Sequence, residues 1–143
     1  MPMIQLTLPT GVLTEQSRRE LQKTLAATLL KWEGAPDTAF FRAQAWSRIE
    51  EVDGDRFGAL EDDAPRFLVD VSVPEGGLSQ RRKEGLVREA TGQVLAAAGL
   101  SDADALRVWV LIHEQPEGTW GAAGNVIQFQ ELAALAQAQR DNA

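Results

Sequence analysis

The feature of this sequence that most constrains its fold is an internal repeat at an offset of 65 residues. A Pro-x-Gly turn in the first half, Pro9-Thr10-Gly11, falls on Pro74-Glu75-Gly76 in the second. The same shift pairs further residues of the same type: Leu21 with Leu86, Gly34 with Gly99, Asp37 with Asp102, and Arg42 with Arg107. The period is too long for a solenoid and there are only two copies, so the pattern indicates a duplicated and fused unit.

Each copy begins with a predicted strand and continues into a predicted helix. The strands are expected at about residues 3–8 and 67–73, where apolar residues alternate with others. After each turn comes a hydroxyl residue, Thr14 or Ser79, in the position of a helix N-cap. Apolar residues then recur at the spacing of one helical face: Leu21, Leu25, Leu29 and Trp32 in the first copy, and Leu86, Ala90, Val94 and Ala97 in the second.

Each copy also predicts a second strand after the helix. Gly34 and Gly99 provide the left-handed residue that commonly ends a helix. The second strands are expected at about residues 41–49 and 107–113. A strand, a helix and a second strand at this spacing form a crossover unit whose two strands are parallel.

Two such units predict an α+β fold with one four-stranded sheet and two helices on one of its faces. The other face is left open, and because an exposed apolar sheet face is costly, we expect several protomers to pack sheet against sheet. Residues 1–143 are expected to form a single domain. Its expected parts are a first unit at about 2–58, a linker at about 50–65, a second unit at about 66–124 and a C-terminal helix at about 127–140.

Composition excludes several kinds of function. The net charge of −7 argues against nucleic acid as a partner. The chain has no cysteine and one histidine, His113, so thiolate chemistry and a histidine-rich metal site are not expected within one protomer. The sequence also contains no long apolar run for a membrane span and no signal-peptide pattern at its start, so we expect a cytoplasmic protein with no membrane partner.

Pro2 is the strongest candidate for a catalytic residue. If Met1 is removed, the ring nitrogen of Pro2 becomes a free secondary amine, whereas an internal proline nitrogen is an amide without basicity. The residue stands at the head of the first predicted strand, which would fix the amine to the sheet. The sequence therefore predicts an N-terminal general base, on condition that Met1 is lost.

Together these features resemble the tautomerase superfamily, which includes 4-oxalocrotonate tautomerase, macrophage migration inhibitory factor, malonate semialdehyde decarboxylase and cis-3-chloroacrylic acid dehalogenase. The local match is strongest in the second unit, at residues 86–90, 108–114 and 118–124. The last of these, Gly-Thr-Trp-Gly-Ala-Ala-Gly, resembles the terminal hairpin of the small family members. For a chain of this length the resemblance implies the fused, double-length form, which typically assembles as a trimer.

The resemblance implies a cofactor-independent keto-enol tautomerase that acts on a small carboxylate of the 2-hydroxydienoate or enolpyruvate type. An apolar pocket would lower the pKa of the Pro2 amine and make it a base near neutral pH. Two alternatives stay open. In one, a protonated Pro2 serves a decarboxylase or a haloacrylate dehalogenase, and in the other the chain is a non-catalytic trimer that retains Met1.

The sequence departs from the family at the residues that hold the substrate carboxylate. Leu13 and Leu78 stand near the places where small members have an arginine before the first helix. Residues that would share one face of the second strand of each unit are the candidates to replace the missing arginines. Trp120 matches the pocket aromatic of the family. The predicted substrate-binding residues are Arg42, Gln44, Arg107, Trp109, His113 and Trp120.

Overall fold

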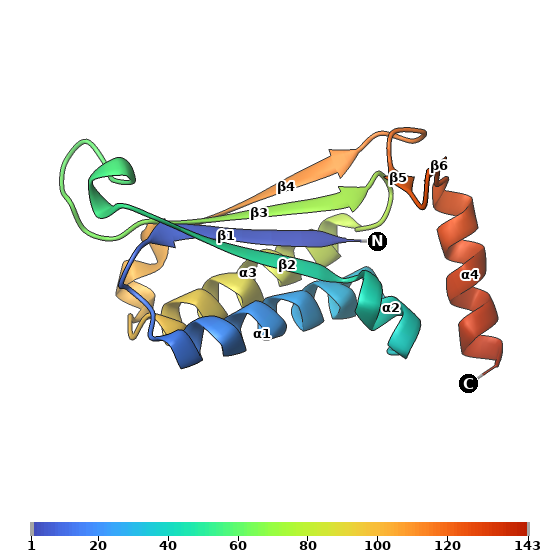
Figure 1. The fold of residues 1–143 in the computed structure, drawn as a ribbon, viewed down its shortest axis with the longest axis horizontal. Coiled ribbons are helices and arrows are strands. Elements are labelled where there is room, and N and C mark those ends of the chain that lie inside the picture. Colours follow the sequence, from blue (N-terminus) through green and yellow to red (C-terminus); the bar gives the residue numbers. More distant parts are fainter. Residues whose placement is uncertain (1, 143) are drawn as a thin grey trace.

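The computed structural model describes residues 2–142, and its centre is one four-stranded mixed sheet (Figure 1). The strands are β1 (Met3–Pro9), β2 (Trp46–Val52), β3 (Phe67–Pro74) and β4 (Val108–Gln115), in the order β2-β1-β3-β4. Within each half the pair is parallel, β1 with β2 and β3 with β4, whereas β1 and β3 run antiparallel. The two repeat units therefore join through their first strands, and the expected α+β architecture is confirmed. Whether Met1 is removed lies outside the described residues.

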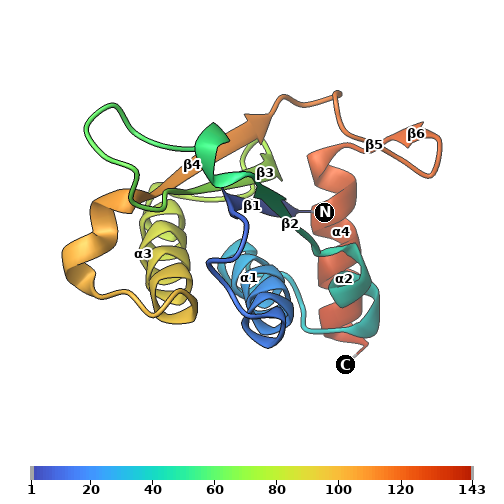
Figure 2. The same cartoon turned by 60° about the vertical axis from the view of Figure 1, so that its left-hand side comes forward.

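Two long helices, α1 (Glu15–Glu33) and α3 (Gln80–Ala97), cover one face of the sheet, as Figure 2 shows. Both predicted N-caps are present. The side chain of Thr14 accepts a hydrogen bond from the backbone N–H of Ser17 at 3.0 Å, and Ser79 accepts one from Arg82 at 3.2 Å. The two caps satisfy backbone donors that the first turn of a helix leaves without partners.

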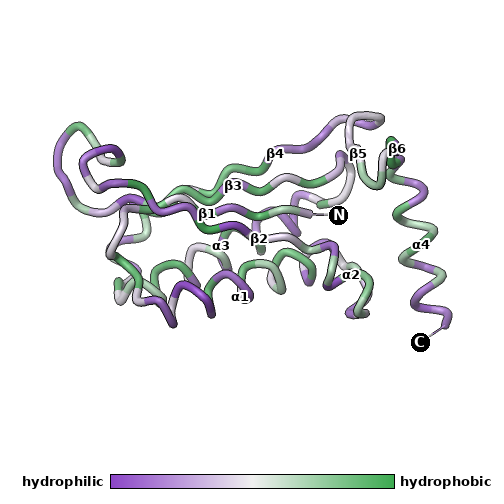
Figure 3. Tube along the Cα trace, viewed as in Figure 1, coloured by the Kyte–Doolittle hydropathy of each residue, from purple (hydrophilic) through white to green (hydrophobic). Residues whose placement is uncertain are grey.

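The core lies between this sheet face and the two helices. Alternate residues of the central strands point into it, and hydrophobic and hydrophilic residues are interspersed along the strands in Figure 3. The opposite face is uncovered in the protomer: on it Trp46 is 62% exposed, Trp109 66% and Leu111 44%. The largest fully buried core side chains include Ile4, Leu6, Leu8, Leu25, Leu29, Phe67, Val69, Val71, Val73, Leu86 and Val94.

The prediction of a strand over residues 41–49 was wrong for its first half. Residues Ala39–Gln44 form a short helix, α2, and the strand begins only at Trp46. Thr38 caps α2 by accepting a hydrogen bond from the backbone N–H of Phe41 at 3.3 Å. The helical turn buries Phe41 in a small apolar cluster with Leu30 and Ala136, and this burial overrides the alternating pattern of the segment.

The remaining elements lie at the two ends of the sheet. Short 3₁₀ helices at Gly54–Arg56 and Asp102–Arg107 lie at one end, so β4 starts at Val108. At the other end a hairpin of β5 (Gly121–Ala122) and β6 (Asn125–Val126) leads into the last helix. That helix is α4 (Phe129–Asp141).

Helix α4 docks against the C-terminal end of α1. The guanidinium of Arg140 donates to the carbonyl oxygen of Gly34, and the hydroxyl of Thr38 donates to the side-chain oxygen of Gln139 at 2.5 Å. Leu132 and Ala136 are its buried residues. Among residues 2–142, no helix combines the length and hydropathy that a membrane crossing requires.

Candidate functional site

Pro2 lies directly before β1 and its side chain is fully buried. Its carbonyl oxygen accepts a hydrogen bond from the backbone N–H of Trp46 at 3.1 Å, which ties the residue to the start of β2. The antiparallel pairing of β1 with β3 places Ser72 opposite Met3, the next residue of the chain. Pro2 is therefore tied to the start of β2 and precedes a residue of β1 that is paired with β3.

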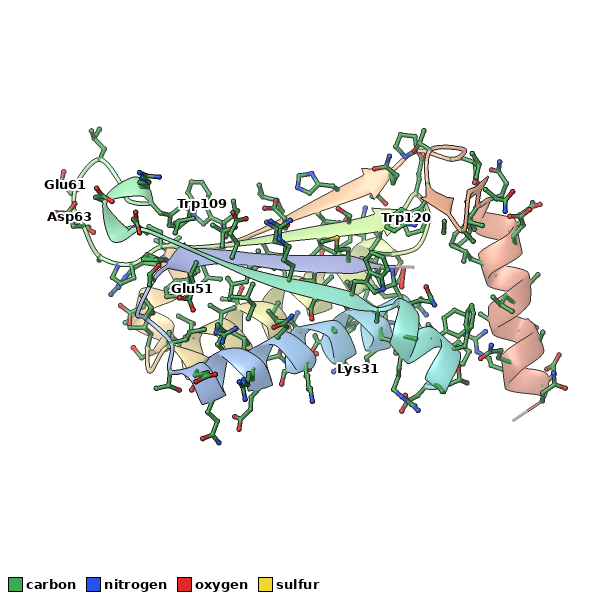
Figure 4. All side chains as sticks on the ribbon, viewed as in Figure 1. Lys31, Glu51, Glu61, Asp63, Trp109 and Trp120 are labelled. Atoms are coloured by element: carbon green, nitrogen blue, oxygen red, sulfur yellow. The ribbon has the colours of Figure 1, made fainter. Side chains whose placement is uncertain are left out.

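Pro2 lines a cavity of about 610 Å³ at this end of the sheet. The walls come from the start of β1, the connection between α2 and β2, the ends of β3 and β4, and the hairpin after β4. Trp120, labelled in Figure 4, lies at the end of the sheet where β1 begins. The lining residues are Pro2, Met3, Gln44, Trp46, Ser72, Gln115, Thr119, Trp120, Gly121, Ala122 and Ala123.

The lining of the Pro2 cavity is uncharged within one protomer. Of its polar side chains, Gln115 donates to the hydroxyl of Thr119 at 2.9 Å, while Gln44 and Ser72 make no side-chain hydrogen bond with another residue in the range 2–142. An amine in such surroundings is partly desolvated, and desolvation disfavours its cationic form. The arrangement can therefore hold a neutral amine beside donors that suit a carbonyl or enolate oxygen.

Two of the predicted substrate-binding residues, Gln44 and Trp120, share this cavity with Pro2. Gln44 is the last residue of α2, whereas the sequence pattern had predicted a strand there. Trp120 reaches it from the loop before β5. Pro2 and Trp120, the residue directly before the hairpin, thus line the same cavity.

Arg42 lies elsewhere within the protomer. Its guanidinium Nη1 donates to the carboxylate of Asp37 at 2.7 Å and to the Asp37 carbonyl oxygen at 3.2 Å. The residue lines a separate cavity of about 720 Å³ between α1, α2 and β2. Because residues 39–44 are helical, Arg42 does not share a strand face with Trp46.

Arg107 and Trp109 lie at the opposite end of the sheet from Pro2. Trp109 is paired with Leu68, near the start of β3, and Figure 4 shows Trp109 and Trp120 at opposite ends of the sheet. Arg107 donates to the Asp104 carboxylate at 2.5 Å. Both residues line a third cavity of about 420 Å³, together with Phe57 and Arg66.

His113 lies on the open face of the sheet. Its Nε2 is 2.8 Å from the carboxylate of Asp70, and its backbone is in register with Ser72, which lines the Pro2 cavity. His113 itself is not among the residues lining that cavity in the protomer. Its predicted contact with substrate therefore stays a prediction.

Sequence reasoning missed Ser72, Gln115 and Thr119 as lining residues. The place of Ser72 and Gln115 follows from the register of the sheet, since Met3 is opposite Ser72 and Pro74 is opposite Gln115. Thr119 follows in the loop after β4, where its hydroxyl accepts a hydrogen bond from Gln115. The repeat predicted parallel strands within each unit but did not predict how the two units pair. Once the antiparallel pairing of β1 with β3 is known, the ends of β3 and β4 must lie beside Pro2.

The described part of the chain shows no grouping of three or more histidine, aspartate or glutamate side chains that could hold a metal ion. One carboxyl stands out, because desolvation in its partly buried position raises the pKa of Glu33. Glu33 lines a further cavity of about 340 Å³ between α1 and α4 and is not among the residues that line the Pro2 cavity.

Comparison with known proteins identifies relatives of this fold. Residues 68–130 match a protein-family model described as tautomerase enzyme. Comparison with curated protein sequences finds no match.

Three solved structures illustrate the likeness. A fused 4-OT described as a wild-type symmetric trimer has a TM-score of 0.71 at 22% identity, covering 92% of this chain and 98% of that one. A member of the cis-3-chloroacrylic acid dehalogenase family has a TM-score of 0.73 at 16% identity, covering 98% and 96%. A macrophage migration inhibitory factor-like protein from Entamoeba histolytica has a TM-score of 0.71 at 17% identity, covering 88% and 98%.

Proposed function

We propose that this chain is a member of the tautomerase superfamily and a keto-enol tautomerase of small carboxylates that uses Pro2 as its general base; the match of residues 68–130 to the tautomerase family model supports this. The observation that carries the proposal is the buried position of Pro2 on the wall of a cavity of about 610 Å³. That volume suits a small organic acid, since ligand pockets of proteins are about 300–1,000 Å³. Trp120 and Trp46 add apolar walls to it.

The reaction requires one proton to move between oxygen and carbon. In ketonisation of an enol acid, the neutral Pro2 amine takes the enol O–H proton. The electron pair of the broken O–H bond forms the carbonyl, and the electron pair of the C=C bond becomes available at carbon. The protonated amine then returns the proton to the carbon of the former double bond, which regenerates the base and leaves no net change in protons. The amide N–H groups of Gln44 and the hydroxyl of Ser72 supply donors for the substrate oxygens, whereas Gln115 donates to Thr119 and the Thr119 hydroxyl donates to the carbonyl oxygen of Pro116.

The first experiment is ketonisation of phenylenolpyruvate by the mature protein as a function of pH. An ordinary α-amino group has a pKa of about 7.7 to 8.0, and the partly desolvated position of Pro2 favours a lower value. Because the base must be neutral, kcat/KM should rise as pH rises through that pKa and then level off. An activity that falls over the same pH interval would point to a protonated Pro2, as in the decarboxylase and dehalogenase alternatives.

We further propose that the protein assembles as a homotrimer through the open face of its sheet. The exposed Trp46, Trp109 and Leu111 on that face support this, because large apolar groups gathered on one surface favour association. In such an assembly a neighbouring protomer would bring its own open face toward the Pro2 cavity. We therefore retain Arg107, Trp109 and His113 as proposed substrate contacts contributed across the interface, with Gln44 and Trp120 contributed from within.

The trimer is testable by light scattering after size-exclusion chromatography. We expect a mass three times the 15.6 kDa of one chain. Replacing Trp109 with Glu places a charge on the open face and should shift the protein toward monomers. The same change at Leu135, a 36% exposed residue of α4, is the control and should leave the mass unchanged. A monomeric wild type at tens of micromolar would contradict the proposal, since stable interfaces give dissociation constants far below that concentration.

A further inference from the structure

A second cavity lies on the far side of β2 from Pro2, in the angle between α1, α2 and β2. Its volume is about 720 Å³. Ala45 and Ser47 line it, whereas the intervening residues Gln44 and Trp46 line the Pro2 cavity. The two cavities are therefore separate and share this short segment of chain as a wall, so we call the second one the α1–α2 cavity.

The α1–α2 cavity has a positively charged rim in a protein whose net charge is −7. Three cationic residues line it, Lys23, Lys31 and Arg42, with Asp37 as the only acidic lining residue. Lys31 is neutralised by Glu89 of α3, at 2.6 Å, and Figure 4 labels it on the C-terminal half of α1 near α2. Lys23 forms no ion pair with any residue of the described range 2–142. One uncompensated positive charge thus remains at the rim.

Arg42 adds hydrogen-bond donors to this charge. Both of its contacts, with the Asp37 carboxylate at 2.7 Å and the Asp37 carbonyl at 3.2 Å, use Nη1. No contact within the described residues engages its Nε or Nη2 groups, and the side chain is 58% exposed. A guanidinium presents five N–H donors in a planar fork that matches a carboxylate.

The floor of the α1–α2 cavity is apolar and made of small side chains. Ala26, Ala27 and Leu30 lie on one face of α1, and Ala45 faces them from the segment before β2. Leu30 is buried in the cluster around Phe41, with which Ala45 also packs, so this part of the floor is fixed by the fold. A cationic rim over an apolar floor matches a ligand with one anionic group and a compact apolar body.

We propose that the α1–α2 cavity is a binding site for a small organic monocarboxylate. Lys23 and the open edge of Arg42 hold the carboxylate, and the apolar body of the ligand lies over Ala26, Ala27 and Leu30. A single negative charge fits because only one positive charge is uncompensated. The proposal concerns a site separate from Pro2 and does not rest on the tautomerase reaction.

The test is calorimetric titration of the full-length protein with benzoate, with benzamide as the uncharged analogue. We expect saturable benzoate binding and at least tenfold weaker binding of benzamide, since a charge-assisted hydrogen bond is worth about 1.4 kcal/mol or more, which is about tenfold. Lys23→Gln should weaken benzoate about tenfold. Its matched control is Arg19→Gln, one turn earlier on α1, which removes the same charge outside the cavity and should leave the affinity within about twofold.

Two filling variants locate the bound benzoate. Ala27→Leu narrows the α1–α2 cavity and should abolish the benzoate binding that depends on Lys23, while Ser72→Leu narrows the Pro2 cavity and should leave that Lys23-dependent binding intact. The opposite pattern would place the carboxylate beside Pro2 and overturn the proposal. It would equally be overturned by the absence of saturable binding up to about 10 mM benzoate, or by equal affinities for benzoate and benzamide.

Discussion

Keeping one extra residue in front of Pro2 is expected to lower kcat/KM for ketonisation of phenylenolpyruvate by about 10²- to 10⁴-fold, the range that general base catalysis contributes. The extra residue converts the ring nitrogen into an amide, which has no proton-accepting lone pair of useful basicity. The Pro2 side chain and all the other residues that line the cavity are unchanged in this extended protein. The N-terminus of each preparation is established by intact mass.

The control carries the same residue after Ala143 instead and should keep wild-type activity. A third protein, Pro2→Ala, separates the amine from the ring, because after loss of Met1 it retains a primary α-amino group. We expect its kcat/KM to lie between those of the wild type and the N-terminally extended protein, and its pH profile to be shifted. Equal rates in the wild type and the extended protein would show that the terminal amine is not the base, and would favour a non-catalytic role for the family fold.

The architecture could be predicted from the sequence because the repeated signals are local. Gly11 and Gly76 occupy equivalent turns with φ of 86° and 88°, a region that favours glycine. Thr14 and Ser79 then cap the two long helices. Each of these residues acts within a few positions of itself, so its effect can be read without knowing the tertiary structure.

The segment around Arg42 could not be predicted in this way. Its alternation of apolar and polar residues is typical of a strand, but Phe41 is buried against Leu30 and Ala136, the latter from a helix about a hundred residues later in the chain. That contact, together with the Thr38 cap, favours a short helix of six residues. The two arginines that the repeat pairs, Arg42 and Arg107, consequently lie in different structural surroundings.

The candidate site could likewise be predicted from the sequence only in part. Pro2 and Trp120 could be named because one begins a strand and the other stands in a recognisable hairpin sequence. Ser72 and Gln115 could not be named, because they lie beside Pro2 only through the pairing of β1 with β3 and of β3 with β4. Sequence patterns predicted the strands, but the pairing of the two halves depends on long-range contacts.

The second large effect is expected at Gly85, in the middle of α3. A Cβ atom at this buried position would lie 2.2 Å from Cη2 of Trp32 and 2.5 Å from its Cζ3, far inside van der Waals contact. The indole is held in place, because its Nε1 donates to the Glu89 carboxylate at 2.7 Å. Lys31 hydrogen-bonds the same carboxylate and lowers the pKa of Glu89, which keeps this acceptor ionised. The close packing of α1 on α3 therefore requires glycine here.

Gly85→Ala should lower the free energy of unfolding by about 1–2 kcal/mol, since overpacking a core costs about 1–3 kcal/mol and the better helix propensity of alanine returns up to about 1 kcal/mol. For a chain of this size that corresponds to a fall in Tm of about 3–8 °C. Thermal denaturation followed by circular dichroism, at one fixed protomer concentration, measures it.

Gly92→Ala is the matched control on the same helix. A Cβ at Gly92 meets nothing within 4 Å, so only the propensity gain applies and Tm should rise by about 1–4 °C. Combining Gly85→Ala with Trp32→Leu should cost less than the two single changes together, because the smaller side chain makes room for the new methyl group. If Gly85→Ala instead raised Tm as Gly92→Ala does, Trp32 would be free to turn away, and the α1–α3 contact would not depend on the glycine.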